Sequence, residues 1–300
     1  MTTIGRILIG LDFSEPSRRA ARWAARDLAP EAALRLVHVI DLPRPPTFLE
    51  GLYPPRERLL RLLRGDAERQ IEEMARVLEA DRPGRAVEVE IRDGRTHDEL
   101  ADAATGWSAD LVVVGEHGQR PGIWRMLGST AERLIRVCRV PVMVTRAATA
   151  GVPRFILVPI DESGQTESVL RWGLVLGRMH GARITVLHVL HPMLVTHVGL
   201  VSSTPKKESV QGQLERCARL WVEEMIARVG GDPDEVDVVI AYGESRYEIL
   251  AALKRYEVDL VVMGSRGAGG VTRALLGSVA TAVIRGSACP VLVVSDEPST

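Results

Sequence analysis

The chain has 300 residues, which predicts two domains at roughly 150 residues per domain. With 46% hydrophobic and 26% charged residues it has an ordinary globular composition, which excludes a disordered, collagen-like or coiled-coil chain. The formal net charge is −1, so no overall positive field attracts nucleic acid or an anionic membrane, and any anion must be bound locally.

Short apolar runs alternate with longer helical patterns along the chain, which is typical of a parallel sheet with crossover helices. In the first half we expect strands at 5–11, 33–40, 86–91, 110–115 and 140–145, and helices at 15–29, 57–80, 95–106 and 129–137. The runs at 111–114 and 261–263 are apolar without alternation, as expected for strands that are covered on both faces.

The second half of the sequence repeats the first at an offset of 149 residues. Residues 109–115 recur as 258–264, and the pair Gly128-Ser129 recurs as Gly277-Ser278. A repeat of this length is a duplicated domain, because the unit of a solenoid is far shorter.

We therefore predict an α/β protein with two tandem doubly wound parallel sheets. Domain 1 is expected over residues 1–148 and domain 2 over residues 149–300. A short segment of small residues joins them.

A Gly-x2-Gly-x9-Gly-Ser pattern follows the fourth predicted strand in both copies. Glycines let the backbone approach a ligand closely, successive N–H groups form a concave nest, and the next helix points its N-terminus at the same place. The pattern therefore predicts an anion cradle suited to phosphate. The structural alternative is that the first glycine only turns the chain and that Ser129 with Glu132 forms a capping box.

The first strand of each copy ends in an acidic residue, Asp12 or Asp161. If the strand order reverses between the first and fourth strands, their carboxyl ends flank the crevice where open parallel sheets bind ligands. Both aspartates are therefore candidate binding residues, and either could hold Mg²⁺ through water.

These motifs resemble those of the universal stress protein domain, and the whole chain resembles the tandem form of that family. His38-Val39, His188-Val189 and a final Pro-Val-x-Val strand add to the resemblance. It implies five strands in the order 3-2-1-4-5 with helices on both faces. For the ATP-binding branch it implies adenine near the ends of strands one and two.

Carried over residue by residue, the resemblance implies that Asp12 and Val39 hold adenosine in the first half, and Asp161 and Val189 in the second. It implies that the phosphates are bound by Gly115, His117, Gly118, Gly128, Ser129 and Thr130, and by Gly264, Arg266, Gly267, Gly277, Ser278 and Val279. It further implies that the domains pair through their last strands as an intramolecular pseudo-dimer, with a homodimer as a further option.

The two glycine loops differ in charge. Glu116 and His117 stand where the second copy has Ser265 and Arg266. A carboxylate about 6 Å from a phosphate charge costs roughly 3 kcal/mol at an effective dielectric constant of about 20. Arginine is always cationic and can bind two phosphate oxygens at once. We therefore expect the second site to bind ATP more tightly.

Other residues indicate no further chemistry. Cys138, Cys217 and Cys289 have no CxxC spacing, so neither a disulfide framework nor a zinc site is predicted. The N-terminus lacks a signal-peptide pattern and no apolar run could span a membrane. We expect a cytoplasmic protein with no nucleic-acid or membrane partner and no metal site formed by protein ligands alone.

Neither loop has the lysine of a Walker P-loop, and no acidic pair is placed by a motif to activate water. We therefore predict an ATP-binding universal stress protein that acts as a nucleotide-dependent sensor or regulator in the stress response, with no catalytic residues and at most weak ATPase activity. The first alternative is a slow nucleotide hydrolase or nucleotidyl-transfer enzyme on the same fold. The second is a nucleotide-free scaffold with vestigial glycine loops.

Overall fold

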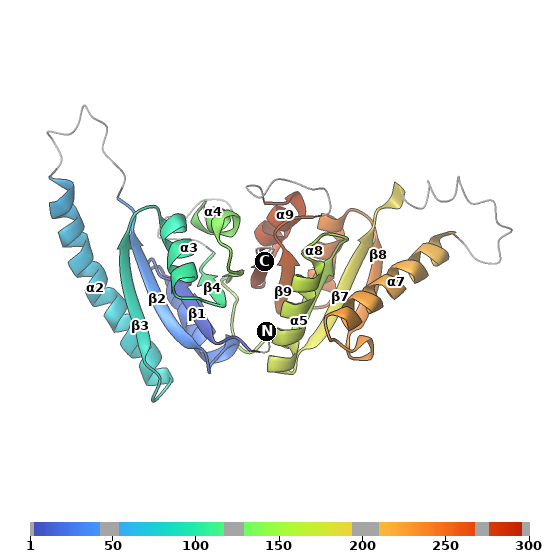
Figure 1. The fold of residues 1–300 in the computed structure, drawn as a ribbon, viewed down its shortest axis with the longest axis horizontal. Coiled ribbons are helices and arrows are strands. Elements are labelled where there is room, and N and C mark those ends of the chain that lie inside the picture. Colours follow the sequence, from blue (N-terminus) through green and yellow to red (C-terminus); the bar gives the residue numbers. More distant parts are fainter. Residues whose placement is uncertain (1–2, 43–53, 117–128, 194–209, 268–275, 296–300) are drawn as a thin grey trace, which may run out of the picture. The chain divides into compact units, whose positions relative to one another are not determined.

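The computed structural model describes residues 3–42, 54–116, 129–193, 210–267 and 276–295 (Figure 1). The chain divides into two compact units, one from Ile4 to Gly151 and the other beginning at Val152. Among the described residues, no helix combines the length and the apolar character needed to cross a bilayer.

The first unit alternates strands and helices along its whole length. Its elements are β1 (Arg6–Gly10), α1 (Glu15–Trp23), a π-helical turn (Ala24–Leu28), β2 (Ala33–Ile40), α2 (Arg56–Asp81), β3 (Val87–Asp93), α3 (Thr96–Gly106), β4 (Leu111–Val114), α4 (Ser129–Val137) and β5 (Val142–Val144). The strands are parallel and lie in the order β3-β2-β1-β4-β5.

The second unit has the same plan. Its elements are β6 (Phe155–Ile160), α5 (Thr166–His180), β7 (Arg183–Leu190), α7 (Val210–Arg228), a 3₁₀ turn (Pro233–Glu235), β8 (Asp237–Tyr242), α8 (Ser245–Arg255), β9 (Leu260–Gly264), α9 (Ser278–Gly286) and β10 (Val291–Val294). These strands are also parallel, in the order β8-β7-β6-β9-β10.

The structure therefore confirms the predicted fold class and the strand order 3-2-1-4-5 in each copy. The predicted helix at 15–29 differs, because its α-helical part ends at Trp23. The amide of Ala29 then donates to the carbonyl of Ala24, five residues back, which is a π-helical hydrogen bond. An apolar helical pattern does not distinguish these two hydrogen-bond spacings.

The central strands form the core of each unit. All four residues of β4 are buried, and Leu260, Val261 and Val262 of β9 have no exposed surface. Strands buried on both faces need no alternation of polar and apolar residues, which explains the continuous apolar runs.

An aspartate before the fourth strand ties each sheet together at its amino end. Asp110 Oδ2 accepts hydrogen bonds from the amides of Gly5 (2.7 Å) and Arg6 (2.9 Å). Asp259 Oδ2 accepts equivalent bonds in the second unit, from Arg154 (2.9 Å) and Phe155 (3.0 Å). These bonds fix the start of the first strand beside the fourth.

We expect Asp110→Ala to lower the free energy of unfolding of its unit by about 1–2 kcal/mol, since two backbone amides lose a charged acceptor. Asp259→Ala should have a similar effect in the other unit. Urea unfolding of the full chain measures both effects, with Asp102→Ala as a control for an exposed carboxylate on α3. Equal stability of Asp110→Ala and the control would contradict the role of this contact.

Candidate functional site

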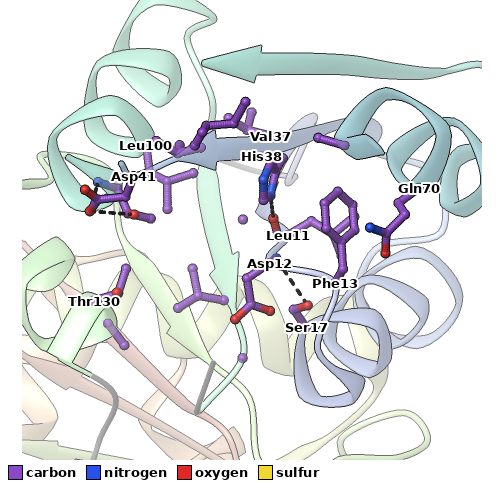
Figure 2. Close-up of a pocket in the computed structure, with 18 of the residues that line it drawn as sticks. Leu11, Asp12, Phe13, Ser17, Val37, His38, Asp41, Gln70, Leu100 and Thr130 are labelled. Carbon is purple, nitrogen blue, oxygen red and sulfur yellow. Dashed lines mark hydrogen bonds between the residues drawn. The ribbon is translucent and has the colours of Figure 1, made fainter. Parts of the chain in front are cut away.

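A pocket of about 690 Å³ opens in the first unit where β1 and β4 end side by side (Figure 2). Its walls come from the ends of β1, β2 and β4 and from α2, α3 and α4. The predicted residues Asp12, Val39, Gly115 and Thr130 all line it. The strand ends thus form the crevice expected at the point where the strand order reverses.

The second unit has a pocket of about 320 Å³ at the equivalent place, beside the ends of β6, β7 and β9. All of the residues predicted for this half line it, namely Asp161, Val189, Gly264, Arg266, Gly267, Gly277, Ser278 and Val279. Residues that are far apart in the sequence are therefore brought to one cavity.

Some predicted residues of the first half cannot be placed. His117, Gly118 and Gly128 lie outside the described residues, and Ser129 is described only as the first residue of α4. The first glycine loop is therefore represented in the structure by its two ends, Gly115 and Thr130.

Both aspartates are oriented by short hydrogen bonds. Asp12 Oδ1 accepts from the amide (3.1 Å) and the hydroxyl (2.6 Å) of Ser14, which is also the N-cap of α1. Asp161 Oδ1 accepts from the amide of Ser163 at 3.1 Å. In each unit the serine of the Asp-x-Ser motif therefore orients an aspartate that lines the pocket.

The second glycine loop packs its backbone closely beside Asp161. A Cβ at Gly267 would lie 2.9 Å from Asp161 Oδ2, and one at Gly277 would lie 3.3 Å from the carbonyl oxygen of Ser265. The amide of Gly277 also donates to that carbonyl at 2.8 Å. Only glycine fits these positions without displacing a neighbour.

The N-terminus of α9 opens into the second pocket. Gly277 is the N-cap, and it has no side chain that could cap the helix. The first N–H groups of a helix have no partner within the helix and carry its positive dipole end. Ser278, Val279 and Ala280 line the pocket, so this end of α9 is suited to an anion.

A buried glutamine, Gln165, fixes the second loop and was not predicted. Its Nε2 donates to Ser265 Oγ at 3.0 Å, and its Oε1 accepts from the amide of Arg266, also at 3.0 Å. The Arg266 amide is thus already used within the protein. The first copy has Pro16 at the equivalent position, which packs against Gly115.

Glu116 is paired with Arg146 in the first unit, Oε2 to Nη1 at 3.3 Å, and their side chains are only 16% and 6% exposed. The expectation that Glu116 strongly repels phosphate therefore needs correction, because the buried guanidinium of Arg146 offsets its charge. The expected preference of phosphate for the second pocket then depends on Arg266, which lines that pocket.

His38 lies on the wall of the first pocket, with Nδ1 2.7 Å from the carbonyl oxygen of Leu11. Burial lowers the pKa of His38, although the bond to Leu11 and the charge of Asp12 oppose this effect. The ring is therefore neutral at pH 7. Since Nδ1 donates to a carbonyl, Nε2 is the acceptor.

Phe13 stacks on His38 with ring centroids 4.4 Å apart. Its φ of 64° lies in the left-handed region, which bulky residues rarely adopt. Arg18 holds it there, since Nε of Arg18 donates to the Phe13 carbonyl at 3.1 Å and the guanidinium lies 5.9 Å from the ring centroid. This wall of the pocket was also not predicted.

Among the described residues, no three histidine, cysteine, aspartate or glutamate side chains gather as a metal cluster.

The model of the universal stress protein family matches the chain twice, at residues 3–146 and 154–295. A universal stress protein from Mycolicibacterium smegmatis is 30% identical over 300 residues, covering 96% of each chain. The crystal structure of a universal stress protein from Archaeoglobus fulgidus covers 100% of this chain and 99% of its own, at 22% identity and a TM-score of 0.71. A universal stress protein solved in complex with cAMP matches 47% of this chain, with a TM-score of 0.33.

We expect Gln165→Leu to lower the free energy of unfolding of the second unit by about 1–3 kcal/mol, because Ser265 Oγ and the Arg266 amide lose a buried partner. Hydrogen exchange at the Arg266 amide should become faster. Gln211→Leu, at an exposed position on α7, is the control. An unchanged exchange rate at Arg266 would show that Gln165 does not hold the loop.

His38 should make the first unit less stable in acid. Its pKa is lower in the folded state than the ordinary value of 6.5, so the unfolded chain binds the proton more readily. The contribution to stability is present above pH 6.5 and is lost as the pH falls below it. Urea unfolding between about pH 7.5 and about pH 5.5 should therefore show a smaller loss of stability in His38→Asn than in the unsubstituted protein. Equal losses would contradict this assignment.

Proposed function

Because the chain belongs to the universal stress protein family, we propose that it is an ATP-binding member that acts as a nucleotide-dependent sensor or regulator in the stress response. One observation carries the proposal: the second pocket brings a glycine loop, a helix N-terminus, an arginine and an aspartate together at the ends of adjacent parallel strands.

The residues of the second pocket fit the parts of ATP. The uncapped N-terminus of α9 and the cation of Arg266 suit the phosphates. Side chains of Ile160, Leu187, Val189 and Ile249 offer an apolar surface for adenine. Gly267 leaves the backbone bare where a Cβ would meet Asp161, as a close approach by a ligand requires.

ATP would join segments that are separate in the sequence. Asp161 belongs to the β6–α5 connection, Arg266 to the β9–α9 connection and Val189 to β7. A ligand that contacts all three restrains them together, which gives a partner a way to distinguish the ATP-bound protein from the free one. Asp161 would hold Mg²⁺ through water if the nucleotide binds together with this ion.

The pocket favours binding over hydrolysis. No lysine lines the described parts of either pocket, and in the second pocket Asp161 is the one carboxylate among the lining residues described. Slow hydrolysis or nucleotidyl transfer stays the rival proposal, and release of product from radiolabelled ATP over many turnovers would distinguish it from binding alone. The cytoplasmic location, the pseudo-dimer and the homodimer stay predictions.

We expect Gly264→Asp or Gly277→Asp to weaken ATP binding more than Gly115→Asp does. An added carboxylate near the phosphates costs roughly 3 kcal/mol, or about two decades in affinity, at an effective dielectric constant of about 20. The favoured second site should show the larger effect. Calorimetric titration of each variant measures it.

Gly106→Asp is the matched control, because a Cβ at Gly106 meets nothing within 4 Å and the residue lies at the end of α3, outside both pockets. Equal losses in Gly115→Asp and Gly264→Asp would contradict the preference for the second site. Titrations in which no ATP binds to the unsubstituted protein would overturn the proposed function.

A further inference from the structure

Helices α2 and α7 occupy equivalent places in the two units. Both bury an Ala-x3-Val/Ile-x2-Met pattern, and the buried residues Ala67, Ile71, Met74 and Ala75 correspond to Ala218, Val222, Met225 and Ile226 at a constant separation of 151 residues. Gln70 of α2 is therefore equivalent to Trp221 of α7. At the start of the first helix, Phe13 is equivalent to Glu162 at the offset of 149 residues.

The same histidine is covered by an aromatic ring in both units, but from different elements. His38 stacks with Phe13, which comes from the β1–α1 connection. His188 contacts Trp221 of α7, with ring centroids 5.0 Å apart. Each unit has one aromatic residue at these two positions, and in the first unit Phe13 lies on the side of His38 that faces Gln70 (Figure 2).

The two pockets also differ in how far they reach towards the helix that carries Gln70 or Trp221. In the first unit α2 lines the pocket with four side chains, Leu63, Asp66, Ala67 and Gln70. In the second unit no described residue of α7 lines the pocket, His188 is only 7% exposed, and the volume is about 320 Å³ instead of about 690 Å³. Trp221 is equivalent to Gln70, which lines the first pocket.

The additional space lies on the base side of the proposed nucleotide. Thr130 and Gly115 mark the phosphate side of the first pocket, and Figure 2 shows Thr130 and Gln70 on opposite sides of it, with His38 and Phe13 towards Gln70. An adenine beside Asp12 and Val39 would therefore have its outer edge directed towards α2.

The wall on α2 has both polar and apolar groups. Gln70 Nε2 donates to Asp66 Oδ2 at 3.0 Å, and Arg18 donates to Gln70 Oε1 at 3.1 Å. Leu63 lines the pocket from the same helix, and the ring of Phe13 lines it from the β1–α1 connection. This wall would accept a planar or apolar group that has a hydrogen-bond donor close to the atom by which it is attached to the base.

We propose that the two sites differ in the base they accept: the first binds a purine nucleotide that carries an added group on its base, and the second excludes that group. Gln70 and Trp221 are the residues that determine this difference. The inference rests on the proposed function, because the position of adenine comes from it.

The test compares ATP with N6-benzyl-ATP by calorimetric titration of the full chain. In the unsubstituted protein the analogue should bind at one site, and Gly264→Asp should retain that binding whereas Gly115→Asp should lose it. Gln70→Trp should weaken binding of the analogue by roughly tenfold or more relative to its effect on binding of ATP, because the indole overfills the space that the added group needs. Glu73→Trp adds the same side chain to the exposed face of α2 and should leave both affinities unchanged.

Trp221→Gln should open the second pocket, so that the analogue binds at two sites. If Trp221→Gln fails to fold, Trp221→Phe is the second variant to measure, because it keeps an aromatic ring beside His188. Its smaller ring should let the analogue bind at the second site, with lower affinity than in Trp221→Gln. If ATP binds to neither site, the proposed function fails. If ATP binds but the analogue binds nowhere, binds equally to both sites, or is unaffected by Gln70→Trp, the base-size inference fails and the proposed function stands.

Discussion

Both units depend on one constraint of their sheets: the first and fourth strands are adjacent and parallel, yet the chain leaves them towards opposite halves of the sheet. The backbone pairs Ile9 with Val113 in the first unit and Leu157 with Val261 in the second. The first strand of each unit continues into α1 or α5, whereas the fourth strand continues into the glycine loop, so the two connections separate beyond the strand ends. A crevice is left between them, with backbone amides on one side and an aspartate on the other.

On this common framework the copies have diverged through residues that support the pocket. Pro16 in one copy and Gln165 in the other both contact the loop after the fourth strand, the first by packing and the second by hydrogen bonds. The ring that covers the pocket histidine has likewise moved, from Phe13 to Trp221. The duplicated sheet therefore tolerates two differently constructed sites.

The sequence alone predicted the sheets and part of the pocket lining, since both depend on local patterns. The apolar runs set the strands, and the spacing of Gly264, Gly267 and Gly277 placed the loop beside α9. The strand order and the valines came from family resemblance. The role of Gln165 and the pair of Glu116 with Arg146 depend on contacts between residues distant in sequence, for which one sequence carries no local signal. The change from α-helix to π-helix after Trp23 was hidden for a different reason, because the π-helical segment Ala24–Leu28 has five residues and is too short to show a different apolar period.

The backbone of Phe13 limits which residues evolution can place there. A side chain held in the left-handed region costs roughly 1–3 kcal/mol, which here is balanced by contacts that the ring makes with His38 and Arg18. An alanine would keep the strain and lose those contacts, and glycine would relieve the strain but leave the histidine bare. In the second copy Glu162 and Glu167 stand in place of Phe13 and Arg18, and the retained His188 contacts Trp221 instead. The ring and the arginine have therefore been replaced together, while the histidine has stayed.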